Sequence, residues 1–155
     1  MDDHLDTDYD TDLLLWTNRQ VELLRTKKFD LLDLDNIISE LEYQVRKDKR
    51  EVMHRLIGLM THLLKYKYQP QRISASWTRT IIGHRREVTG ILHDMPSLRP
   101  AIDDYVANGY PKALRDAIRE TRLPGATFPK ENPFTVQQIL DEDFWPGENE
   151  KAAET

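Results

Sequence analysis

The chain has 155 residues, no cysteine and a formal net charge of −5. This length predicts one domain with a real hydrophobic core, and the lack of cysteine excludes disulfides and thiolate metal sites. No apolar run approaches the roughly 18 residues that span a bilayer. The acidic start MDDHLDTDYD is unlike a secretory signal, so we expect a cytoplasmic protein that makes no membrane contact.

The charge is unevenly distributed along the chain. Residues 1–43 carry a net charge of −8, residues 44–93 carry +8 and residues 94–155 carry −5. A basic block can mark a nucleic-acid-binding surface, or acidic helices can pack around a basic helix hairpin. The acidity of the whole chain opposes binding to a polyanion and favours the second interpretation.

The N-terminal part predicts a disordered segment followed by a helix. Residues 1–9 are expected to be disordered, and a helix with a broad apolar face is predicted over residues 12–26. In the loop that follows, Phe29 and either Leu31 or Leu32 are expected to insert into the core.

The longest predicted helix spans residues 35–69. Its apolar residues recur at helical intervals, which indicates one buried face; they are Leu34, Ile37, Ile38, Leu41, Val45, Val52, Leu56, Leu59, Met60 and Leu63. Pro70 ends this helix because proline lacks an N–H group. The helix would be roughly 50 Å long, whereas a compact chain of this size is about 39 Å across. We therefore expect an elongated molecule rather than a break of the helix in the polar residues 46–51.

The remaining pattern predicts further helices. A helix over residues 74–93 follows a short turn, so it should form an antiparallel hairpin with the long helix. Gly83 and Gly90 within it predict close packing against a neighbour. The next two helices are predicted over residues 97–108, closed by Gly109, and over residues 111–122, opened by a proline.

A capping box of Thr135 and Gln138 predicts a final short helix, and residues 147–155 are expected to be disordered. The predicted fold class is therefore all-α: an elongated helical bundle of about five to six helices, built on a long antiparallel helix hairpin. One domain is expected over residues 10–146.

Several sequence blocks resemble one known family. HLLKYKYQP, SWTRTIIGHRREV, PSLRP, YPKALRDA and ILDEDF occur in order, and the opening YDTDLLLWTNRQVELLRTKKFDLLDLDNIISELE also resembles the family's start. This is the bacterial family called domain of unknown function 29, and the resemblance covers roughly residues 9–146. It implies an all-helical cytoplasmic domain and no assigned activity. The matched motif positions, which have no known role, are His62, Lys65, Gln69, Pro70, Ser76, Trp77 and Arg86.

The end of the long helix carries the strongest candidate binding site. His62, Lys65, Tyr66 and Gln69 share one helix face because they are spaced by three and four residues. The candidate binding residues on both sides of the hairpin turn are His62, Lys65, Gln69, Arg72, Ser76, Trp77 and Arg86. They could form a polar pocket with an aromatic wall that holds a phosphate or a carboxylate. Alternatively, they cap the last carbonyl groups of the helix and bond across the hairpin.

Other chemistry has weaker support. Arg79 and His84 have four residues between them, and the pairs Arg55–His62 and Arg86–His93 have six. These spacings are similar to the Arg-x(4–6)-His motif of metal-independent ribonucleases of the HEPN superfamily. The Glu51-x-x-His54 pair resembles half of a helical di-iron site, but no second pair exists. We predict no catalytic residue, no metal site and no cofactor.

The sequence therefore favours a non-enzymatic helical module that binds a protein partner, or a second copy of itself, through its long basic hairpin. The alternative hypothesis is an RNA-binding or nucleic-acid-binding domain, or a metal-independent ribonuclease that uses its Arg–His pairs.

Overall fold

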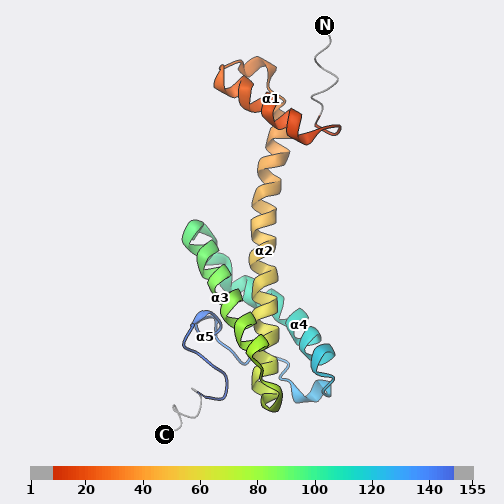
Figure 1. Ribbon diagram of the computed structural model, residues 1–155, viewed down its shortest axis with the longest axis vertical. Helices are drawn as coiled ribbons and strands as arrows, with labels where there is room; N and C mark the ends of the chain where they lie inside the picture. The colour runs from red at the N-terminus through yellow and green to blue at the C-terminus, as the bar shows by residue number, and fades with distance from the viewer. Residues whose placement is uncertain (1–8, 149–155) are drawn as a thin grey trace. The chain divides into compact units, whose positions relative to one another are not determined.

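The computed structural model describes residues 9–148 (Figure 1). Most of the two segments expected to be disordered, residues 1–9 and 147–155, lie outside this range. Contacts divide the chain into two units, residues 1–47 and 48–155; a single domain over residues 10–146 and an elongated molecule stay predictions. The predicted all-α class is confirmed, since the elements in the described part of the chain are five α-helices and four short 3-10 helices.

In the first unit, helix α1 (Leu13–Arg25) leads through the 3-10 turn η1 (Phe29–Leu31) into α2 (Leu34–Tyr68). Asp12 caps α1, because its side chain accepts a hydrogen bond from the backbone N–H of Leu15. The prediction that the loop inserts into the core is wrong. Phe29 is 58% exposed and Leu31 is 60% exposed, and Leu32 is only partly buried.

A polar network around Asp33 joins the elements of this unit. The Asp33 carboxylate accepts hydrogen bonds from Trp16 Nε1 at 2.9 Å and from Asn36 Nδ2 at 2.8 Å. Its backbone N–H donates to Gln20 Oε1 at 2.9 Å. The hydrogen bonds from Asn36 and Trp16 stabilise the charged carboxylate and lower the pKa of Asp33. Polar groups therefore join α1 to the start of α2, whereas Phe29 and Leu31 lie exposed in η1 between the two helices.

In the second unit, α2 and α3 (Ala75–Asp94) form the predicted antiparallel hairpin, joined by the 3-10 turn η2 (Pro70–Arg72). Lys65 lies over the ring of Trp77, and Gly58 lies against the ring of His84. The residue earlier in α2 therefore contacts the residue later in α3, which is the order expected of two antiparallel helices. Helix α2 is a single helix through residues 46–51, so the alternative of a break there is excluded.

Helix α4 (Ile102–Thr121) follows the 3-10 segment η3 (Pro96–Ala101) and corrects the prediction of two separate helices. Gly109 does not close a helix, and Pro111 lies inside this one. A Cβ atom at Gly109 would lie 3.1 Å from Ile57 Cγ1 and 3.2 Å from Met53 Sδ. Gly109 therefore lets α4 approach α2 closely, and Figure 1 shows α3 and α4 on either side of this part of α2.

The glycines of α3 do not have the predicted role. A Cβ atom at Gly83 or Gly90 would meet nothing within 4 Å. The close helix contacts occur at Gly58 and Gly109 instead, because the shared core lies around α2. Among the described residues, the fully buried large apolar side chains of this core all belong to α2, α3 and α5. They are Val52, Leu56, Leu59, Met60, Leu63, Leu64, Ile81, Val88 and Ile139.

The C-terminal segment is fastened to α3 by a buried arginine. After the 3-10 turn η4 (Gly125–Thr127), helix α5 (Val136–Leu140) begins with the predicted capping box. Arg85 of α3 is 0% exposed and donates from Nε to Ile139 O at 2.8 Å and from Nη2 to Gln138 O at 3.1 Å. These bonds satisfy carbonyl groups that so short a helix leaves unpaired at its end.

Among the described residues, no helix is both long and apolar enough to cross a membrane.

Candidate functional site

The last turns of α2 and the end of α4 enclose a polar pocket of about 400 Å³. Four of the predicted binding residues line it, namely Lys65, Gln69, Arg72 and Trp77. The local sequence places them there for simple reasons. Helix α2 must end before Pro70, and Ser74 caps α3 by accepting a hydrogen bond from the backbone N–H of Trp77. The turn therefore brings the last residues of α2 and the first of α3 to one end of the hairpin.

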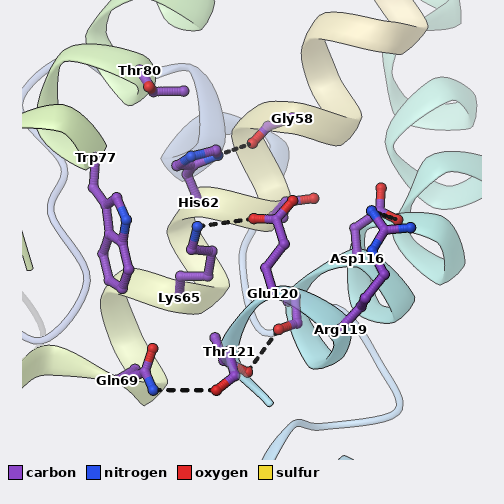
Figure 2. A network of polar contacts seen from close by, with 12 residues as sticks. Gly58, His62, Lys65, Gln69, Trp77, Thr80, Asp116, Arg119, Glu120 and Thr121 are labelled. Atoms are coloured by element: carbon purple, nitrogen blue, oxygen red, sulfur yellow. Dashed lines mark hydrogen bonds and ion pairs between the residues drawn. The ribbon is translucent and has the colours of Figure 1, made fainter. Parts of the chain in front are cut away.

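Lys65 is the central cation of this pocket, although it is only 8% exposed. Figure 2 shows its amine directed at Glu120 of α4, with Trp77 on its other side. The Lys65 Nζ atom lies 2.9 Å from Glu120 Oε2 and 4.7 Å from the centroid of the Trp77 ring. A buried ammonium needs such partners because desolvation disfavours an unpaired charge. One carboxylate and one aromatic face together compensate the charge of Lys65.

The floor and rim of the pocket come from the ends of both helices. Gln69 is 7% exposed, and its Nε2 donates a long hydrogen bond to Thr121 O at 3.5 Å. Arg122 forms the C-terminal cap of α4 in the left-handed region, with φ 59° and ψ 20°. Arg72 and Arg122 are exposed, and within residues 9–148 neither guanidinium has a carboxylate at ion-pair distance. Two exposed cations therefore line the pocket, neither of them paired with a carboxylate of the described residues.

The other three predicted residues lie elsewhere. Arg86 is exposed and its Nε lies 3.9 Å from Glu142 Oε1. Ser76 is exposed on α3, where its backbone carbonyl accepts a bond from Thr80 Oγ1 at 2.9 Å. His62 lines a separate pocket. The binding role of all seven residues stays a prediction, whereas the structure brings four of them together.

A second pocket, of about 270 Å³, contains three histidines, His54, His62 and His84. The Nδ1–H group of His62 donates to Gly58 O at 2.9 Å, and the His62 and His84 rings lie 6.4 Å apart. Burial, and to a lesser extent the nearby charge of Arg55, lower the pKa of His84 to about 4. Burial also lowers the pKa of His62. Both rings are therefore predominantly neutral at pH 7, and within the described residues the buried Nδ1 of His84 has no hydrogen-bond partner.

This histidine pocket bears on the two weaker chemical hypotheses. Two arginines of the predicted Arg–His pairs are bound to carboxylates, Arg55 to Glu51 at 2.8 Å and Arg86 to Glu142. His and acidic residues of the described chain form no group of three or more arranged to hold a metal ion. RNA cleavage by Arg–His pairs stays a prediction.

The first unit carries a different candidate feature, an exposed apolar surface. Of the thirteen exposed large apolar residues in the described chain, all but Ile73 belong to this unit. Four of them form a row on α2, at intervals of four, three and four residues; we call Leu34, Ile38, Leu41 and Val45 the apolar seam. Beside Leu41 and Val45 the surface has an open depression bordered by Glu42 and Arg46. Large exposed apolar patches are uncommon on soluble proteins and often mark interaction sites, so this row is a candidate binding surface.

Sequence patterns alone missed Glu120, Thr121 and Arg122, which complete the polar pocket. They are separated from Lys65 by more than 50 residues of chain, so no local spacing connects them to it. One available signal was the predicted end of a helix near residue 122, because the side chains at a helix end gather with those of neighbouring helix ends. Arg85 was also missed, because a charged residue on a helix is ordinarily solvent-exposed.

The comparisons with known proteins define a family without an assigned activity. No curated protein and no solved structure matches the chain significantly. A family model does match, over residues 9–145, which includes the apolar seam, the hairpin and both pockets. The resemblance recognised from the sequence blocks is thereby confirmed: the chain belongs to the family described as Domain of unknown function DUF29.

Proposed function

We propose that this protein is a helical protein-interaction module whose first unit binds a helix of another protein along the apolar seam. One observation carries the proposal. Leu34, Ile38, Leu41 and Val45 are 57%, 52%, 64% and 53% exposed, although they continue the apolar pattern of a helix whose later residues are fully buried. The sequence had favoured the basic hairpin as the interaction surface. Among the described residues of the second unit, however, the only exposed large apolar residue is Ile73, so the proposal places the surface on the apolar seam.

The small core of the first unit supports this proposal. Its buried apolar residues in the described chain are Trp16 and Leu23. Units of about 40 residues need an additional source of stability, such as a partner. Covering the remaining half of the four seam side chains would stabilise a complex by about 3–6 kcal/mol, at about 1.5–3 kcal/mol for a fully buried side chain. The exposed apolar residues of α1 would add to this.

The spacing and the flanking charges indicate the chemistry of the partner. Intervals of four, three and four residues match the a and d positions of a coiled coil, which bind the apolar stripe of another helix. Asp35 and Glu42 follow Leu34 and Leu41 directly and occupy the flanking e positions. Residues 1–47 carry a net charge of −6. We therefore expect a partner helix with Lys or Arg beside its apolar stripe, rather than a second acidic copy of this unit.

Site-specific photo-crosslinking tests the proposal. A photoreactive residue replaces Leu41 in the full-length protein, and a matched variant carries it at Ile73, the exposed apolar residue of the second unit. We expect position 41 alone to crosslink one defined segment, an amphipathic helix with basic flanks, and Leu41→Asp to abolish copurification of that partner.

Three outcomes would overturn it. They are equal capture from both positions, a partner that still binds Leu41→Asp, and a dimer in light scattering that Leu41→Asp dissociates, which would assign the seam to a second copy. The alternative function, RNA binding or cleavage by the basic residues 44–93, stays a prediction.

A further inference from the structure

We propose that the polar pocket between the ends of α2 and α4 binds an oxyanion, a carboxylate or phosphate group of a small molecule. Its volume of about 400 Å³ lies within the usual range of small-molecule sites. The pocket belongs wholly to the second unit and is independent of the apolar seam.

The balance of charge in the pocket favours an anion. Three cations line it, Lys65, Arg72 and Arg122, against one carboxylate, Glu120. Glu120 is already bound to Lys65 at 2.9 Å. The guanidinium groups of Arg72 and Arg122 therefore supply the uncompensated charge, and their planar arrays of N–H donors match the oxygens of a carboxylate or phosphate.

The buried part of the pocket is already ordered. Lys65 and Gln69 are 8% and 7% exposed, so their side chains are held by their surroundings rather than free in solvent. Lys65 is bound on two sides by Glu120 and Trp77, as Figure 2 shows. A ligand entering between the two arginines would meet a preformed wall and would lose little affinity to the ordering of side chains.

Arg122 occupies a backbone position at the end of α4 where glycine is the usual residue. Its φ of 59° places it in the left-handed region, where glycine is favoured and a side chain costs free energy. Glycine would stabilise such a left-handed helix end more than arginine does. The position nevertheless carries an arginine, and its side chain lines the pocket.

The helix ends set a limit on the strength of binding. The carboxyl ends of α2 and α4 both lie at the pocket, and their partial negative charge opposes an anion. The arginines must therefore supply the attraction. For the same reason, removing one of them is expected to weaken binding severely.

NMR titration of the full-length protein tests the proposal, with inorganic phosphate and citrate as separate probes at low ionic strength. The indole N–H signal of Trp77 and the side-chain N–H signals of the arginines report on the pocket. We expect at least one probe to shift them saturably; the probe that binds tells a phosphate site from a carboxylate site.

The decisive variant is Arg122→Gly, which removes the charge and relieves the left-handed backbone, so the variant should fold at least as well as the native protein. Loss of one charge-assisted interaction should weaken binding by about tenfold to a hundredfold. Lys27→Gly is the matched control, since Lys27 also has a positive φ, of 57°, and does not line the pocket. Binding that survives Arg122→Gly, or that Lys27→Gly reduces equally, would overturn the proposal, as would the absence of saturable shifts with both probes.

Discussion

Replacing Gly58 with alanine should destabilise this protein, the reverse of the usual effect within a helix. In an exposed helix this substitution stabilises by about 0.8–1 kcal/mol. At Gly58 the new Cβ atom would lie 2.6 Å from Nε2 of His84 and 3.2 Å from its Cε1. Real Cβ atoms do not approach so closely, so the half-buried ring, or the contact between α2 and α3, must shift. Overpacking of this kind costs about 1–3 kcal/mol, which leaves a net loss of about 1 kcal/mol.

Urea denaturation followed by circular dichroism measures this effect. Gly83→Ala and Gly90→Ala are matched controls in α3, because a Cβ atom at either position meets nothing within 4 Å. Each control should raise the free energy of unfolding by about 0.5–1 kcal/mol. In a His84→Ala background the clash disappears, and Gly58→Ala should then stabilise the protein by about the same amount as the controls.

The sign of the change decides the matter. If Gly58→Ala stabilised the native protein as much as Gly90→Ala does, the close approach of the two helices would not be real. If the effect of Gly58→Ala were the same with and without His84, the contact with that ring would not be its cause. A double-mutant cycle of these variants isolates the pairwise contribution.

Two further predictions concern buried charge. Arg85→Ala should lower the free energy of unfolding by about 2–6 kcal/mol, because the carbonyls of Gln138 and Ile139 lose their donors, at about 1–3 kcal/mol for each unsatisfied group; Arg85→Met should cost less. Hydrogen exchange of the α5 amides would show where the loss arises, and a loss under 1 kcal/mol would contradict the capping role of Arg85. The pKa of His84 is lowered from 6.5 to about 4, so as the pH falls His84 takes up a proton in the unfolded chain before it does in the folded protein. The contribution of neutral His84 to the free energy of unfolding is therefore complete above about pH 6.5. It is lost as the pH drops towards 4, by about 2 kcal/mol after allowance for solvent screening. Urea denaturation at pH 7 and pH 4.5 checks this loss, which should shrink in His84→Gln; an unchanged loss would assign it to other groups.

Local patterns were enough to predict the secondary structure of most of the chain. The apolar intervals of α2, the proline after it and the capping box of α5 act over a few residues, so they can be recognised in the sequence. The same patterns failed for α4, where Gly109 and Pro111 ordinarily signal a helix boundary. Packing of Gly109 against Ile57 and Met53 overrides that signal, and such packing depends on another helix.

Burial was not determined by the local pattern. The apolar stripe of α2 is regular from Leu34 to Leu63, yet Val45 is 53% exposed and Val52 is 0% exposed. Only the presence of α3 and α4 beside the later residues distinguishes them. The sequence could therefore not predict that the apolar seam is exposed, because exposure depends on which residues have neighbours in the tertiary structure.

The polar pocket divides in the same way. The sequence by itself grouped seven candidate residues at the hairpin turn, from helical spacing and a short turn. The structure brings four of them together, Lys65, Gln69, Arg72 and Trp77, and places His62, Ser76 and Arg86 elsewhere. Only the tertiary structure added Glu120 and Arg122, which lie at the end of α4, at least 43 residues further along the chain than any of these four. Such contacts form because each helix must bury its apolar face against another, and the polar groups at the helix ends are then brought together by that packing.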